Sequence, residues 1–174
     1  MREAMLNSPT GQGCSGMDSS YPERVKARAE ALYLQQGLNC AEAVFKALLE
    51  EAGQSCPVEM VRMASAFGKG QGGSGCLCGS LAGGQMAMGY FFGRVEETGK
   101  APELCGKSAK LLHERFVEAN RATCCRILSK GLIHGTPEQK KACGVRTAGN
   151  AAIAAEIILE TLGACHEQAQ SCTN

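Results

Sequence analysis

The chain has 174 residues, with 18 basic and 17 acidic side chains, so its formal net charge is +1. This length suits one domain with a sizeable core, and a hydrophobic fraction of 44% excludes wholesale disorder. The near-zero charge and the lack of tryptophan give no reason to expect nucleic acid as a partner. The composition is unusual in its 22 glycines and 11 cysteines.

The N-terminal sequence has no apolar run of the length that a secretory signal needs, so we expect a cytoplasmic protein. The longest uncharged stretch, residues 70–93, is interrupted by glutamines and many glycines, and we expect no membrane span. Thiols stay reduced in the cytoplasm, and many cysteines there indicate metal binding or redox chemistry rather than structural disulfides.

Capping signals predict the first helices, which follow the polar segment 1–19 that we expect to be disordered. Ser20 begins the first helix, and Glu23, three residues later, completes a capping box. Asn39 caps the second helix, in which apolar side chains recur at three- and four-residue spacing. A third helix is predicted over 57–67.

A glycine-rich loop, 68–79, leads into the fourth predicted helix, 79–93. Gly79, Gly83 and Ala87 recur at four-residue steps, which predicts a helix face that another backbone can approach closely. That contact could form within the chain or across a homodimer.

No segment alternates with a period of two residues, so the sequence predicts no sheet. We expect a single all-α domain, a bundle of about seven helices over 20–163, and a frayed polar tail over 164–174. The later helices of this bundle are predicted over 102–120, 124–131, 136–144 and 145–162.

Several cysteines stand where predicted helices begin, namely Cys40, Cys78, Cys124 and Cys125. The partial positive charge of a helix N-terminus lowers the pKa of a thiol and favours the thiolate, which is the form that binds metal. Cys143 lies at a predicted joint between two helices. These positions favour a functional role over packing for Cys40, Cys78, Cys125 and Cys143.

The cysteine spacing matches no local metal motif. It offers no Cys-x-x-Cys pair with paired histidines for a zinc finger, and no Cys-x-x-Cys-His for covalent haem. A site must therefore be assembled by the fold. Cys76 and Cys124, the neighbours of two favoured cysteines, stay open as further ligands. Gly73, Gly75 and Gly79 could bring backbone N–H groups close to a cofactor.

The segments NCAEAVF, FGKGQGGSGCLCGSLAGGQMAMGY and CCRIL, followed by Cys143, resemble the redox-active protein family named for four spaced cysteines and a CGAxxG motif. The resemblance covers roughly residues 25–160, and the motif falls on residues 78–83, with Ser80 in place of the usual alanine. It implies that the family's cysteines are the four favoured above. A related domain occurs in split-Soret cytochromes, which combine haem with an iron–sulfur cluster. The resemblance therefore implies an iron–sulfur cluster here. It implies no covalent haem, because this chain lacks the haem attachment motif.

Three functions remain open. The first is an electron carrier that holds a 2Fe–2S or 4Fe–4S cluster and exchanges electrons with an unidentified partner protein. The second is a metal-free thiol–disulfide enzyme or sensor that uses Cys76 with Cys78, or Cys124 with Cys125. The third is a structural protein with zinc in a four-cysteine site.

Overall fold

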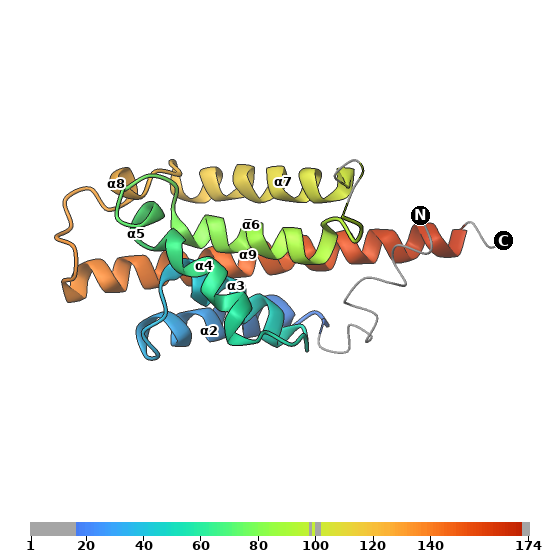
Figure 1. Ribbon diagram of the computed structural model, residues 1–174, viewed down its shortest axis with the longest axis horizontal. Coiled ribbons are helices and arrows are strands. Elements are labelled where there is room, and N and C mark those ends of the chain that lie inside the picture. The colour runs from blue at the N-terminus through green and yellow to red at the C-terminus, as the bar shows by residue number, and fades with distance from the viewer. Residues whose placement is uncertain (1–16, 98, 100–101, 172–174) are drawn as a thin grey trace.

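The computed structural model describes residues 17–97, 99 and 102–171 (Figure 1). Within them the chain forms helices and one isolated bridge but no strand, which confirms the all-α prediction. The elements in chain order are α2 (Tyr21–Leu34), α3 (Cys40–Glu51), α4 (Val58–Ala64), the 3-10 turn η1 (Ser65–Phe67), α5 (Gly68–Gln71), α6 (Gly79–Phe92), α7 (Glu103–Asn120), α8 (Cys125–Leu128) and α9 (Pro137–Ser171).

Helix α9 runs the length of the bundle and packs against α2, α3, α6 and α7. The two helices predicted over 136–144 and 145–162 are therefore one, and the predicted joint was wrong. Gly144 does not end the helix because it serves close packing. A Cβ atom at this position would lie 2.9 Å from the Cδ2 atom of Leu34 in α2.

The structure describes only part of the two terminal segments, 1–19 and 164–174, that we expected to be disordered or frayed. Residues 1–16 of the segment expected to be disordered lie outside them, and Met17 packs against the core. Helix α9 extends to Ser171, through most of the segment expected to fray. By length and composition alone, Pro137–Cys165 of α9 would also suffice to cross a membrane, a criterion that the core helix of a soluble bundle can equally meet.

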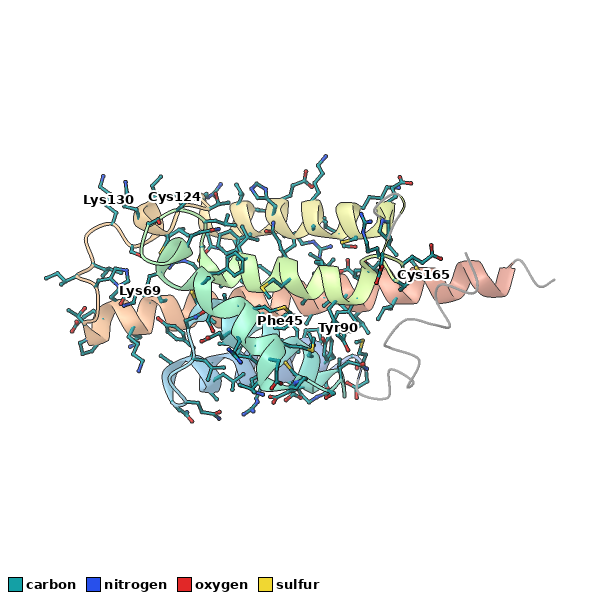
Figure 2. All side chains as sticks on the ribbon, in the orientation of Figure 1. Phe45, Lys69, Tyr90, Cys124, Lys130 and Cys165 are labelled. Atoms are coloured by element: carbon teal, nitrogen blue, oxygen red, sulfur yellow. The ribbon has the colours of Figure 1, made fainter. Side chains whose placement is uncertain are left out.

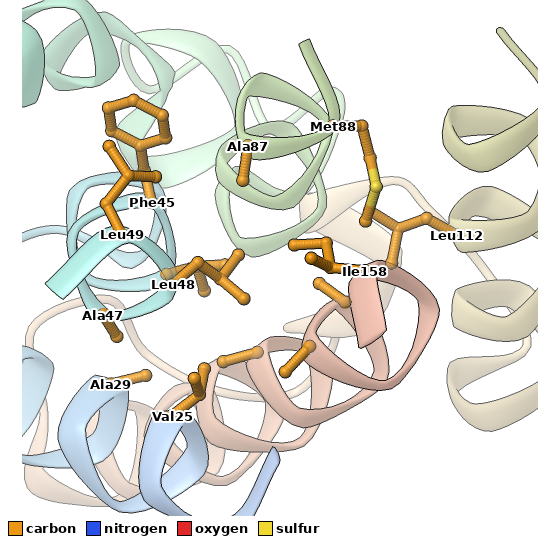
Figure 3. Packing of buried hydrophobic residues seen from close by; sticks show 14 of the residues in the cluster. Val25, Ala29, Phe45, Ala47, Leu48, Leu49, Ala87, Met88, Leu112 and Ile158 are labelled. Carbon is orange, nitrogen blue, oxygen red and sulfur yellow. The ribbon is translucent and has the colours of Figure 1, made fainter. Parts of the chain in front are cut away.

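The core lies where α2, α3, α6 and α9 meet (Figure 3). Leu48 of α3, Met88 of α6 and Ile158 of α9 are fully buried there. Helix α6 approaches α3 closely because Gly83 has no side chain, since a Cβ atom would lie 2.3 Å from the carbonyl oxygen of Ala41. This confirms the predicted close approach, and α3 of the same chain fills this part of the small-residue face.

A capping box orders the start of α3, where Cys40 is the first helical residue. The Asn39 side chain accepts hydrogen bonds from two backbone N–H groups of the first turn at 2.9 and 3.1 Å, and the Glu42 carboxylate accepts one from the Asn39 N–H at 2.8 Å. The capping box predicted at Ser20 was wrong. Its side chain makes no cap bond, and its hydroxyl donates to Asp18 instead.

Candidate functional site

A cavity of about 280 Å³ lies at the end of the bundle formed by α5, α8 and the start of α9. Cys40, Cys78, Cys125 and Cys143 all line it, although 38, 47 and 18 positions separate them along the chain. The other lining residues are Tyr33, Gly37, Leu38, Asn39, Lys69, Ser80, His134, Gly135, Gln139, Lys140, Arg146 and Thr147.

Three of the four cysteines reach the cavity from the start of a helix. Cys40 is the first residue of α3, Cys78 is the N-cap of α6, and Cys125 is the first residue of α8. These positions confirm the sequence-based placement to within one residue. Cys143 lies inside α9, two turns from its start, rather than at a joint between helices.

Backbone hydrogen bonds join the end of the glycine-rich loop, where α6 begins, to the segment where α8 begins. The Cys78 N–H donates to the carbonyl oxygen of Thr123 at 2.8 Å, and the Cys125 N–H donates to the carbonyl oxygen of Cys76. An isolated antiparallel bridge joins Leu77 to Cys124 between these bonds. Cys78 and Cys125 are therefore held beside each other by main-chain contacts that no local sequence signal predicts.

A left-handed turn in the same loop allows this close approach. Lys69, Gly70, Gln71 and Gly72 have φ values of 53°, 71°, 68° and 64°. A Cβ atom on Gly70 would lie 2.6 Å from the Cβ atom of Cys125, so no larger residue fits. Lys69 and Gln71 each adopt this conformation at a cost of about 1 kcal/mol, which the surrounding contacts must offset. The glycine-rich loop is thus an ordered element of the site.

Cys143 has the richest set of polar contacts in the cavity. Gln139 donates through Nε2 to its sulfur at 3.0 Å, and Arg146 approaches it through Nη1 at 3.8 Å. A second Arg146 nitrogen, Nη2, donates to the carbonyl oxygen of Leu128 at 3.0 Å. The third, Nε, is buried and has no hydrogen-bond partner among the described residues. Arg146 therefore brings an uncompensated positive charge to the cavity.

Burial among thiols opposes ionisation in this cavity. The pKa of Cys40 rises to about 12, mainly because of burial and then because of the neighbouring Cys78, although the Lys69 backbone N–H acts in the opposite sense. Burial and Cys78 also raise the pKa of Cys125. Both shifts run opposite to the lowering that we expected at a helix N-terminus, and burial of the thiol is their largest cause.

Tyr33 of α2 faces the same cysteines. Burial, the charges of Cys143 and Cys40, and a hydrogen bond to Cys143 all raise the pKa of its hydroxyl. The packing of Leu34, the next residue, against Gly144 brings this part of α2 close to Cys143.

The remaining candidates lie outside the cavity lining. Cys76 is exposed, and Cys124 donates through its sulfur to the carbonyl oxygen of Gly75 at 3.0 Å. A Cβ atom on Gly73 would meet nothing within 4 Å, whereas one on Gly79 would lie 2.4 Å from the Cys40 sulfur. Gly79 thus packs directly against Cys40. The ligand roles of Cys76 and Cys124, and the backbone contacts of Gly73, Gly75 and Gly79 with a cofactor, stay predictions.

The thiols surround the cavity without converging on a single point. Across the described residues, no three side chains of His, Cys, Asp or Glu are grouped closely enough to hold one metal ion. All nine cysteines in that part of the chain are free thiols.

Sequence reasoning missed three residues that contact or face Cys143, namely Tyr33, Gln139 and Arg146. Gln139 lies four residues before Cys143 and Arg146 three residues after it, so helical spacing could have found both. Tyr33 offers no such local signal because it reaches the site through the packing of α2 on α9.

The comparison with protein families agrees with the cysteine pattern. The family model described as "Putative redox-active protein (C_GCAxxG_C_C)" matches residues 38–157, and all four cavity cysteines lie in this range. No curated protein and no solved structure matches the chain. The match spans well over half of the chain, and the protein is therefore a member of the C_GCAxxG_C_C family of redox-active proteins.

Proposed function

We propose that this protein is an electron carrier that binds an iron–sulfur cluster through Cys40, Cys78, Cys125 and Cys143. The observation that carries the proposal is that four cysteines from four separate segments line one cavity. Four cysteine thiolates are the usual protein ligands of both 2Fe–2S and 4Fe–4S clusters. When bound, such a cluster would supply a centre that gains and loses one electron.

The size and shape of the cavity support this proposal. Its volume of about 280 Å³ leaves room for a group much larger than one water molecule. Gly70 and Gly79 lie so close to Cys125 and Cys40, respectively, that a Cβ atom would clash with them. These two glycines therefore allow the backbone to approach the cysteines that line the cavity.

The spacing of the thiols favours a cluster over a single zinc ion. A zinc ion holds each sulfur at about 2.3 Å, so its ligands must crowd around one point. A cluster distributes its ligands over several iron atoms. Thiols that share a cavity without grouping around one ion suit the second arrangement better.

The charges around the cavity suit an anionic group. Arg146, Lys69 and Lys140 line it, and no aspartate or glutamate does so among the described residues. Gln139 and the Lys69 backbone N–H donate to thiol sulfurs. Positive charge and hydrogen bonds at the sulfurs offset negative charge and make the reduced state of a cluster easier to reach.

The test is to purify the full chain without oxygen, reconstitute it with iron and sulfide, and measure iron, acid-labile sulfide, visible absorption and electron paramagnetic resonance. We expect iron and sulfide in equal amounts and bleaching of the absorption by dithionite. Cys143→Ser should lose most of the iron, whereas Cys105→Ser should keep it because Cys105 lies on α7 outside the cavity. Bound zinc, or a metal-free protein that cycles between thiols and disulfide, would overturn the proposal.

A further inference from the structure

The end of the molecule that holds the cavity has a net positive charge, whereas the rest of the chain has a net negative charge of similar size. Residues 121–147 contain six basic side chains and one acidic side chain, a net charge of +5. The rest of the chain has twelve basic and sixteen acidic side chains, a net charge of −4. Segment 121–147 comprises α8, the start of α9 and the loop between them, which lie together at one end of the bundle (Figure 1).

Among the described residues, no acidic side chain forms an ion pair with these positive charges. The ion pairs formed by described residues join side chains of α2, α3, α7 and α9 beyond residue 155, together with Asp18. None of them includes a basic residue of segment 121–147, or Lys69 of α5. Figure 2 shows Lys69 and Lys130 at this end of the molecule, opposite Cys165.

The negative charge of a cluster would not account for all of these cations. Lys140 and Arg146 line the cavity, but Arg126, Lys130 and Lys141 are exposed and do not. Arg126 also donates through Nη2 to the carbonyl oxygen of Ser74 at 2.8 Å. Exposed charges can act on an approaching molecule over about one Debye length, roughly 10 Å at 0.1 M salt.

Exposed aliphatic side chains accompany the cations. Ile127, Ile133 and Val145 are 61%, 77% and 63% exposed, and all three belong to segment 121–147. Apolar contacts within a polar rim are the usual make-up of a protein–protein interface. The combination differs from a nucleic-acid surface that stacks bases on large aromatic rings, because the whole chain has no tryptophan and this segment contains no phenylalanine or tyrosine.

From this juxtaposition we propose that segment 121–147, with Lys69, is the docking surface for an acidic redox protein, and that docking places that protein's redox centre over the cysteine-lined cavity. The inference rests on the proposed function because it assigns the partner of the same site. Complementary charge accelerates association and selects orientation more than it adds affinity.

The test measures binding of an acidic plant-type ferredoxin to the full chain by surface plasmon resonance, at low and at physiological salt, with the iron content of the same sample determined in parallel. We expect binding that weakens as salt increases. The double variant Lys130→Glu/Lys141→Glu should lower the association rate constant by about tenfold. The matched variant Lys107→Glu/Lys110→Glu on α7, with the same change in net charge, should change it little.

Each outcome separates the two proposals. Iron in the sample without ferredoxin binding, or equal losses in the two double variants, would overturn the docking surface and leave the electron carrier intact. Salt-sensitive binding by a protein without iron would support the docking surface and overturn the carrier. Anionic phospholipid vesicles, tested in the same way, should not bind. Binding to vesicles but not to ferredoxin would reassign this end to a membrane surface and overturn the inference.

Discussion

Gly79 at the start of α6 lies directly behind the Cys40 thiol of α3. A Cβ atom on residue 79 would stand 2.4 Å from the Cys40 sulfur and 2.7 Å from the carbonyl oxygen of Phe67. The same glycine follows Cys78, so one residue without a side chain positions two of the four cavity thiols. The glycine of the family motif therefore has a steric reason in this structure.

Gly79→Ala should displace Cys40 and destabilise the fold by about 1–3 kcal/mol, because the new methyl group overpacks a closed contact. The reconstituted variant should contain much less iron than the parent protein. Gly89→Ala in the same helix is the control, since a Cβ atom there meets nothing within 4 Å. It should raise stability by about 0.5–1 kcal/mol and keep the iron. Thermal unfolding and iron analysis of both variants check the prediction, which an iron-replete Gly79→Ala protein would contradict.

Cys124 and Cys125 are neighbours in sequence but should respond oppositely to substitution. Cys125→Ser should remove most of the iron because Cys125 lines the cavity. Cys124→Ser should retain it, since the Cys124 sulfur donates to the carbonyl oxygen of Gly75 and a hydroxyl can do the same. Iron and sulfide analysis of the two reconstituted variants distinguishes them. The reverse result would exchange the roles assigned to the two residues.

Gln139 should raise the reduction potential of the bound centre through its hydrogen bond to Cys143. Gln139→Leu removes this donor at similar volume. If the bond favours the reduced state by about 1 kcal/mol, the potential should fall by about 40 mV for a one-electron couple. Gln85→Leu is the control, because Gln85 lies on α6 outside the cavity lining. Redox titration of both variants checks the shift, and an unchanged potential with normal iron content would show that Gln139 has no such role.

The metal-free, reduced protein should lose stability in alkali because of its buried thiols. Cys40 has its pKa raised from an ordinary value of 9.0 to about 12, so folding favours its protonated form. This contribution is complete below about pH 9, where the unfolded thiol is also protonated. It is lost progressively as the pH rises from about 9 to about 12, since only the unfolded chain releases the proton at first.

Denaturant unfolding at several pH values from 7 to about 11 measures this loss. Cys40→Ala should show a shallower decline than the parent protein, with the difference confined to the range above about pH 9. Cys76→Ala is the matched control because Cys76 is exposed. Parallel declines in all three proteins would contradict the assignment of the alkaline loss to Cys40.

Local signals in the sequence determined the fold class and the sites where most of the helices begin. Asn39 followed by Glu42 defines the start of α3, and hence the place of Cys40, because a capping box needs only four consecutive residues. The four-residue repeat of small residues in α6 predicted the close contact that Gly83 makes with Ala41. The same short-range reasoning selected Cys40, Cys78 and Cys125 from the helix starts, whereas Cys143 was selected for a helix joint that the structure does not contain.

Only the tertiary structure decided how those cysteines are grouped and what surrounds them. Gly144 continues α9 instead of ending it. Its lack of a side chain allows Leu34 of α2 to pack closely against the helix. Tyr33 faces Cys143 through that same contact between α2 and α9. The pKa values of Cys40 and Cys125 rise rather than fall, since burial depends on every element around a group, whereas the sequence specifies only the helix on which the group lies. These features depend on packing between segments far apart in the chain, and local sequence patterns carry no information about that packing.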